Sequence, residues 1–166
     1  LVGKKEIMKL GGLEHKEERV FLLSTTYGGE THHLRAAQKS IEILNQNDYE
    51  VTKHIWNVGR TIKENYNTLV KKHSLQEYTK MMGIDCRPYF YFKDNTIRTL
   101  FLQEMIKCGV LAQGIIPSYS HRENEIKQTL DAFDYSLRVL ANAISNNEVN
   151  KLLIGNAVKP VFRKYN

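Results

Sequence analysis

The sequence predicts an α+β fold in which helices cover one face of a small antiparallel sheet. Four segments repeat their apolar residues at helical spacing, and two short apolar runs lie between the second and third of these. The elements follow in the order helix, helix, strands, helix, strand, helix. At 166 residues the chain is long enough for one core, or for one domain with a flanking piece.

The two N-terminal helices are predicted from their apolar stripes. The first begins at Glu30 and ends near residues 45–47, with the stripe Leu34, Ala37, Ile41 and Leu44. The second runs from about Tyr49 to Lys72, with the stripe Val51, Ile55, Ile62 and Leu69. Gly59 lies inside the second helix at a cost of about 1 kcal/mol relative to alanine, and it indicates a close helix crossing.

The rest of the chain alternates strands and helices. Strands are predicted at residues 81–84, 89–92 and 110–116. A helix begins at Asn95 and is closed by Gly109. The last helix follows a predicted capping box from Ser120 to Glu123 and ends near residues 145–147.

Composition narrows the function classes. Hydrophobic residues make up 42% and charged residues 25%, as in an ordinary globular protein. No apolar run approaches the roughly 18 residues of a membrane span, and no signal peptide is expected. Cys86 and Cys108 are too few for a disulfide framework or a zinc site, which favours a reduced, cytoplasmic setting. The net charge of +6 is spread along the chain without a basic block, so we predict no nucleic-acid binding.

An anion-binding corner is predicted after an apolar run at residues 20–24, which reads as a strand. Thr25 and Thr26 offer hydroxyl donors there, and Gly28 and Gly29 allow a close backbone turn before the first long helix begins. The N-terminus of that helix would add free N–H groups. The alternative is that this corner is only the start of a helix.

Other candidate residues have weaker patterns. His32 and His33 point in different directions on a helix and have no cysteine or carboxylate at ligand spacing, so we predict no metal site; either could line a pocket. Arg87 could pair with a substrate carboxylate. Ser118 and His121 lack a nucleophile-elbow pattern and do not predict a hydrolase.

Residues 26–31, Thr-Tyr-Gly-Gly-Glu-Thr, resemble the Thr-x-x-Gly-Asn-Pro loop of class III pyridoxal-phosphate (PLP) aminotransferases. They also resemble a glutamate-1-semialdehyde-aminomutase-like subgroup that carries Glu-Thr-His in place of Asn-Pro. The resemblance implies that Thr26 binds the cofactor phosphate across a dimer interface, with Thr25 as the alternative ligand. Gly28 would contribute a backbone N–H.

Further segments resemble the same family. Residues 97–104, 109–112 and 118–121 are similar to its C-terminal domain, and residues 1–8 to the segment that follows the cofactor lysine. The resemblance therefore implies that residues 1–29 are a remnant of the large domain and residues 30–166 the small domain of a fold-type-I enzyme. It places the Schiff-base lysine before the first residue, because Lys4 and Lys5 match an exposed basic pair of the family.

The sequence thus predicts the C-terminal portion of a PLP-dependent aminotransferase or aminomutase. By this resemblance the complete enzyme would be a homodimer that acts on an amino acid or amino-aldehyde, and this portion alone would be inactive. The alternative is a non-enzymatic α+β binding module.

Overall fold

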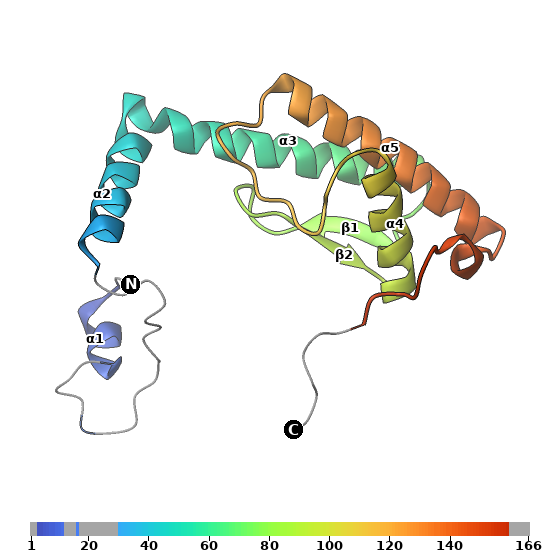
Figure 1. Ribbon diagram of the computed structural model, residues 1–166, viewed down its shortest axis with the longest axis horizontal. Coiled ribbons are helices and arrows are strands. Elements are labelled where there is room, and N and C mark those ends of the chain that lie inside the picture. Colours follow the sequence, from blue (N-terminus) through green and yellow to red (C-terminus); the bar gives the residue numbers. More distant parts are fainter. Residues whose placement is uncertain (1–2, 12–15, 17–29, 160–166) are drawn as a thin grey trace. The chain divides into compact units, whose positions relative to one another are not determined.

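The computed structural model describes residues 3–11, 16 and 30–159 (Figure 1). The chain divides into two compact units, Leu1–Ile43 and Leu44–Asn166. The predicted strand at residues 20–24 lies outside the described residues. The predicted domain boundary between residues 29 and 30 stays a prediction.

The first unit contains α1 (Lys5–Met8), η1 (Lys9–Gly11) and most of α2 (Thr31–Asn45). The bounds of α2 confirm the first predicted helix. None of its residues is buried, and the side chains of Leu34 and Ile41 are both 59% exposed. The apolar stripe that predicts α2 is therefore uncovered within the described part of the chain.

The second unit contains three long helices and a two-stranded sheet. Its elements are η2 (Asn47–Tyr49), α3 (Glu50–Lys72), β1 (Thr79–Met82), β2 (Tyr89–Phe92), α4 (Asn95–Lys107), α5 (Glu123–Ser145) and η3 (Val149–Leu152). Strands β1 and β2 pair antiparallel, with Thr79 opposite Phe92 and Met82 opposite Tyr89. The sheet packs against the helices, which confirms the α+β prediction (Figure 1).

The core of this unit is aromatic. Tyr66 of α3, Phe101 of α4 and Phe133 of α5 are all fully buried. Their ring centroids lie 5.0–6.1 Å apart, with Tyr66 edge-on to both phenylalanines. Such pairs contribute about 0.5–1.5 kcal/mol beyond the area they bury, so these three rings hold the helices together.

Two hydrogen bonds through buried hydroxyl groups connect α3 to the sheet. The Thr79 hydroxyl donates to the Tyr91 carbonyl at 2.8 Å, and the Tyr66 phenol lies 2.7 Å from the Thr79 oxygen. Because the single Thr79 proton is already used, Tyr66 is the donor in that pair. Burial raises the pKa of Tyr66 well above its usual value, so the phenol keeps the proton that it donates.

The third predicted strand, at residues 110–116, is wrong: these residues form no strand in the described structure. The apolar pattern does reflect burial, since Ala112 and Ile115 are buried. A strand also needs a hydrogen-bonded neighbour, and within residues 30–159 this segment pairs with none.

The predicted capping box is also wrong, because α5 begins three residues after Ser120. The Ser118 N–H donates to Nδ1 of His121 at 3.0 Å, and the His121 N–H donates to the Ser118 carbonyl at 3.2 Å. These bonds fold residues 118–121 into a turn. The reciprocal bond forms instead from the Arg122 N–H to the Glu125 carboxylate at 2.9 Å.

Two glycines explain where the structure differs from the predicted strand β1 and from the predicted partner of α3. Gly83 has φ of +92°, so β1 ends before it and does not include residues 83 and 84 as predicted. At Gly59 an added Cβ would lie 1.7 Å from the Asp85 carbonyl oxygen. Gly59 does mark a close approach, but the partner is the loop between β1 and β2 and not a helix.

Among the described residues, no helix combines the length and apolarity needed to span a bilayer.

Candidate functional site

The predicted phosphate-binding residues Thr25, Thr26 and Gly28 lie outside the described residues, so their role stays a prediction. What the structure describes is the start of α2 immediately after them. The Leu34 N–H donates to the Glu30 carbonyl at 3.1 Å, which closes the first turn of the helix. The backbone N–H groups of residues 31–33 precede that bond and point out of the helix N-terminus.

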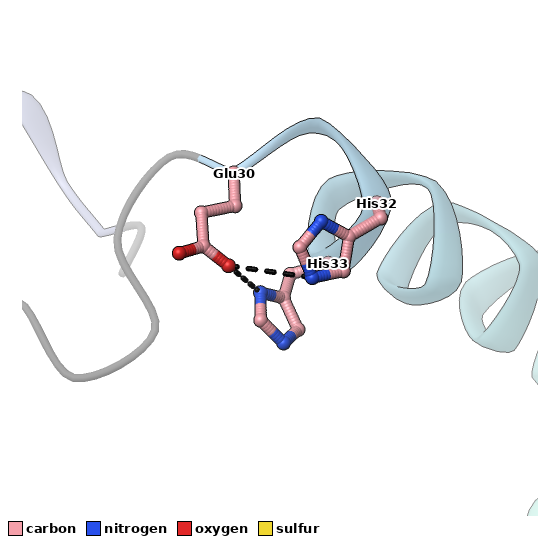
Figure 2. A group of neighbouring side chains, drawn as sticks. All are labelled: Glu30, His32 and His33. Carbon is pink, nitrogen blue, oxygen red and sulfur yellow. Dashed lines mark ion pairs between the residues drawn. The ribbon is translucent and has the colours of Figure 1, made fainter.

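Glu30, His32 and His33 form a cluster at this helix start (Figure 2). One Glu30 carboxylate oxygen lies 3.3 Å from Nε2 of His32 and 2.8 Å from Nδ1 of His33. The two imidazole centroids are 4.1 Å apart. The prediction that no carboxylate lies at ligand spacing from the two histidines is therefore wrong. Glu30 is three residues before His33, which is the spacing of neighbours on a helix.

The cluster offers a donor set for a metal ion. Its three ligand atoms lie within 4.8 Å of one another, and two imidazoles with one carboxylate are a donor set that divalent transition ions accept. For an anion at the helix N-terminus, the backbone N–H groups favour binding and the Glu30 carboxylate opposes it.

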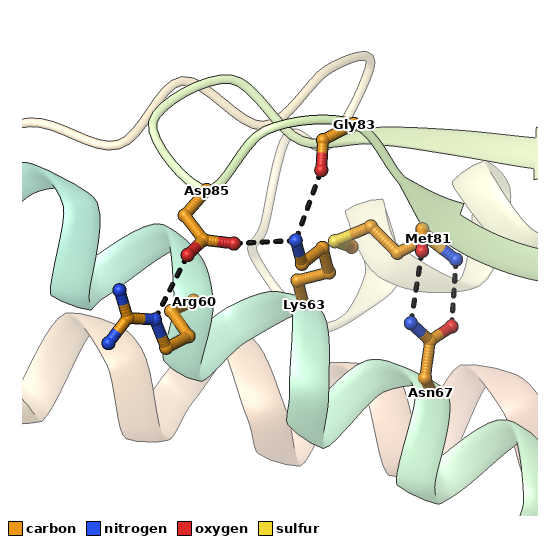
Figure 3. Close-up of polar contacts among 6 residues, drawn as sticks. All are labelled: Arg60, Lys63, Asn67, Met81, Gly83 and Asp85. Atoms are coloured by element: carbon orange, nitrogen blue, oxygen red, sulfur yellow. Dashed lines mark hydrogen bonds and ion pairs between the residues drawn. The ribbon is translucent and has the colours of Figure 1, made fainter.

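The loop between β1 and β2 is held on α3 by charged side chains (Figure 3). Nε of Arg60 donates to the Asp85 carboxylate at 2.9 Å, and Lys63 bonds both Asp85 and, at 3.0 Å, the Gly83 carbonyl. The hydrogen bonds from Lys63 and then Arg60 hold the pKa of Asp85 below its usual value. Arg87 is an exposed residue of this anchored loop, and its pairing with a substrate carboxylate stays a prediction.

His121 holds a turn at residues 118–121. Its Nδ1 accepts the Ser118 backbone N–H, so the proton of the neutral ring lies on Nε2. The Ser118 hydroxyl is 3.0 Å from the same Nδ1. The carbonyl of His121 accepts from Nε2 of His54 at 2.8 Å, which fixes this turn on α3.

Two adjoining hollows flank α4, and the sequence did not reveal them. The larger, of about 680 Å³, runs along β2 and is bounded by Arg98 and Leu102 of α4 and by residues 113–114. The smaller, of about 340 Å³, is mainly apolar and shares Leu102 and Gln113 with the larger. The alternating Tyr-Phe-Tyr-Phe pattern of β2 was the available signal, because it places two tyrosines on a face that helices do not cover.

Comparison with known proteins gives a likeness of fold. No known family model matches the sequence, and no curated protein is similar enough in sequence to count as a relative. The solved structure of the FumI protein of Sphingopyxis sp. MTA144, in its PLP internal aldimine form, matches 76% of this chain with a TM-score of 0.62 and 16% identity. The match covers 31% of the FumI chain. The fold therefore resembles part of a PLP enzyme.

Proposed function

We propose that this chain is the C-terminal portion of a PLP-dependent class III aminotransferase or aminomutase. The observation that carries the proposal is the match of 76% of the chain to part of a protein solved with PLP. The loop at residues 26–31 supports it independently, since it resembles the phosphate-binding loop of that family. The proposal includes the glutamate-1-semialdehyde-aminomutase-like subgroup, whose Glu-Thr-His in place of Asn-Pro this loop also resembles.

In this proposal the chain supplies binding groups. PLP would act as electron sink and amino carrier in the complete enzyme. The Thr26 hydroxyl would donate to the cofactor phosphate, with Thr25 as the alternative, and the Gly28 N–H would add a second donor. The N-terminus of α2 would add its partial positive charge, because it directly follows these residues.

The rest of the assignment follows from the same resemblance. Residues 1–29 would belong to the large domain and residues 30–166 to the small domain. The complete enzyme would be a cytoplasmic homodimer acting on an amino acid or amino-aldehyde, without nucleic-acid or membrane partners. The Schiff-base lysine would lie upstream of this portion, which would therefore be inactive alone.

The cofactor affinity of the complete protein tests the proposal. Thr26→Ala should raise the PLP dissociation constant about tenfold to a hundredfold, because a hydrogen bond to a charged group contributes about 1.5–3 kcal/mol. Thr25→Ala is the matched control and should change the constant only a few-fold. Equal and small effects of both substitutions would show that this corner does not hold the phosphate.

A second experiment examines this chain by itself. After incubation with PLP and reduction with borohydride, mass analysis should find no stoichiometric adduct at a single lysine, because the cofactor lysine is expected upstream. A stoichiometric adduct at Lys4 or Lys5 would contradict that expectation.

A further inference from the structure

The two outer edges of the sheet differ in how their hydrogen-bonding groups are used. On the β1 edge, the side-chain amide of Asn67 donates to the Met81 carbonyl at 3.0 Å and accepts the Met81 N–H at 2.9 Å (Figure 3). The Thr79 N–H donates to the Leu75 carbonyl at 3.1 Å. Asn67 thus takes the place of a neighbouring strand, and this edge is closed.

The β2 edge is open within residues 30–159. The Lys93 N–H donates across the ladder to the Tyr78 carbonyl at 2.8 Å, which fixes the alternation of the antiparallel pairs. Tyr89 and Tyr91 therefore direct their N–H and C=O groups toward β1, and Phe90 and Phe92 direct theirs outward. Among the described residues, these outward groups have no hydrogen-bond partner.

The open edge borders the larger hollow. Residues 89–95 form one side of it, Gln113 and Gly114 contribute to its lining from another segment, and Leu102 lies in it from α4. The smaller apolar hollow continues from Leu102 and Gln113. The unused hydrogen-bonding groups of β2 are therefore accompanied by space for another chain and by apolar surface for its side chains.

The charges around this hollow are mainly positive. Arg98 lines it and makes no ion pair within the described residues. Lys93 also lines it, and its ammonium group lies 5.0 Å from the Tyr78 ring. The acid in the lining is Asp94, whose carboxylate accepts the Ile97 N–H at 2.9 Å as the cap of α4.

We propose that this hollow binds an extended acidic segment of a partner protein, which adds as a strand to β2. Its backbone bonds the outward groups of Phe90 and Phe92, and its carboxylates pair with Arg98 and Lys93. A second copy of β2 is disfavoured as the occupant, because antiparallel self-pairing would bring two sets of these cations together. The site lies in the second unit and uses none of the predicted cofactor residues.

Peptide binding to the full chain tests the proposal. The probe is an eight-residue peptide of alternating glutamate and valine with blocked ends. Its controls are the same peptide N-methylated at alternate residues, and a peptide with lysine in place of glutamate. Amide exchange measured by NMR should show new protection of Phe90 and Phe92 on binding the probe, with Tyr89 and Tyr91 unchanged because they already bond β1.

Substitutions of Arg98 test whether its positive charge contributes to binding of the acidic peptide. Arg98→Ala should weaken binding of the glutamate peptide about twofold to fivefold, as expected for an exposed ion pair. Arg98→Glu should shift the preference toward the lysine peptide. Arg138→Ala is the matched control, because Arg138 is an exposed arginine of α5 that lies over the Tyr135 ring and does not line the hollow. Circular dichroism checks that each variant folds.

Several outcomes would overturn the proposal. Equal binding of the N-methylated peptide would exclude strand addition, and equal binding of the lysine peptide would exclude the acidic preference. Absence of protection at Phe90 and Phe92 with millimolar probe would exclude the site. Protection of these amides that rises with protein concentration, without peptide, would identify a second copy as the occupant.

Discussion

Helices α2 and α3 have similar apolar stripes in the sequence but different surroundings in the structure. Helix α3 buries Val58, Ile62, Tyr66 and Val70 against the sheet and α5, whereas α2 buries nothing among the described residues. Periodicity thus predicts that both segments are helical, while burial depends on the neighbour that each one finds. The proposed function accounts for the contrast, because a helix next to the cofactor corner of a larger dimer would be covered by other parts of that enzyme.

Of the substitutions that test this contrast, the one at the centre of the core should cause the largest loss in the free energy of unfolding. Phe133→Ala removes a ring with no exposed surface that touches the rings of α3 and α4. Unfolding by urea should show a loss of about 3–5 kcal/mol in the free energy of unfolding. A loss below about 1 kcal/mol would mean that the three helices do not share this core.

A smaller effect is expected at Gly59, where α3 meets the loop between the strands. An added Cβ would lie 1.7 Å from the Asp85 carbonyl oxygen and 2.9 Å from Pro117, so the loop must move. Gly59→Ala should therefore lower the free energy of unfolding by about 1–3 kcal/mol, although alanine is the better helix former. Gly155→Ala is a control, since nothing lies near a Cβ at that position. A stabilised Gly59→Ala variant would contradict the contact.

The ion pair between α3 and α5 should make a smaller contribution to the free energy of unfolding, and this contribution should depend on pH. Lys72, and next His73, hold the pKa of Asp134 below its usual value, at 2.9 and 2.8 Å from one carboxylate oxygen. This stabilisation is present above the unfolded pKa of about 3.9 and is lost as pH falls through the lowered folded pKa.

Asp134→Asn should therefore lower the free energy of unfolding by about 0.2–1 kcal/mol at neutral pH, because the side chain is 36% exposed and solvent screens the pair. The difference from the original chain should shrink as the pH falls through the lowered folded pKa of Asp134, because protonation removes the charge that the asparagine also lacks. Asp131→Asn is the control, since Asp131 is 71% exposed and lies 3.9 Å from its partner Lys127. A difference that grows toward low pH would contradict the assignment.

The smallest effect is expected in α2. Leu34→Ala should change the free energy of unfolding of this chain by less than about 0.5 kcal/mol, because the leucine is 59% exposed. Urea unfolding of this variant beside Phe133→Ala measures the contrast directly. A loss of 2 kcal/mol or more, roughly what burial of a leucine contributes, would show that α2 packs as α3 does.

The sequence predicts those elements of the fold that depend on local residue patterns. The four long helices follow apolar periodicity, and β2 follows its alternating aromatics. The start of α5 was missed because residues 118–121 fold into a turn that His121 holds, and the reciprocal bond forms at Arg122 and Glu125 instead. The apolar pattern of residues 110–116 predicts a strand that does not form, because local pattern does not show whether a pairing partner exists.

The candidate site was harder to predict for the same reason. Glu30 lies at helical neighbour spacing from His33, but its contact with His32 depends on the side-chain conformations at the helix start. The open edge of β2 depends on which residues face β1, and therefore on the register of the ladder. The predicted ligands Thr25, Thr26 and Gly28 lie outside the described residues and rest on the local sequence pattern and the resemblance.

The central claim is that the corner at Thr26 holds the cofactor phosphate of the partner subunit in a dimeric PLP enzyme. The most direct test mixes complete subunits carrying Thr26→Ala with complete subunits lacking the cofactor lysine. Each parent dimer should be inactive or weakly active. In the mixed dimer both defects would fall on one site and leave the other whole, so activity should reappear in the mixture. If mixed dimers form and activity does not return, Thr26 serves its own subunit or does not bind the cofactor.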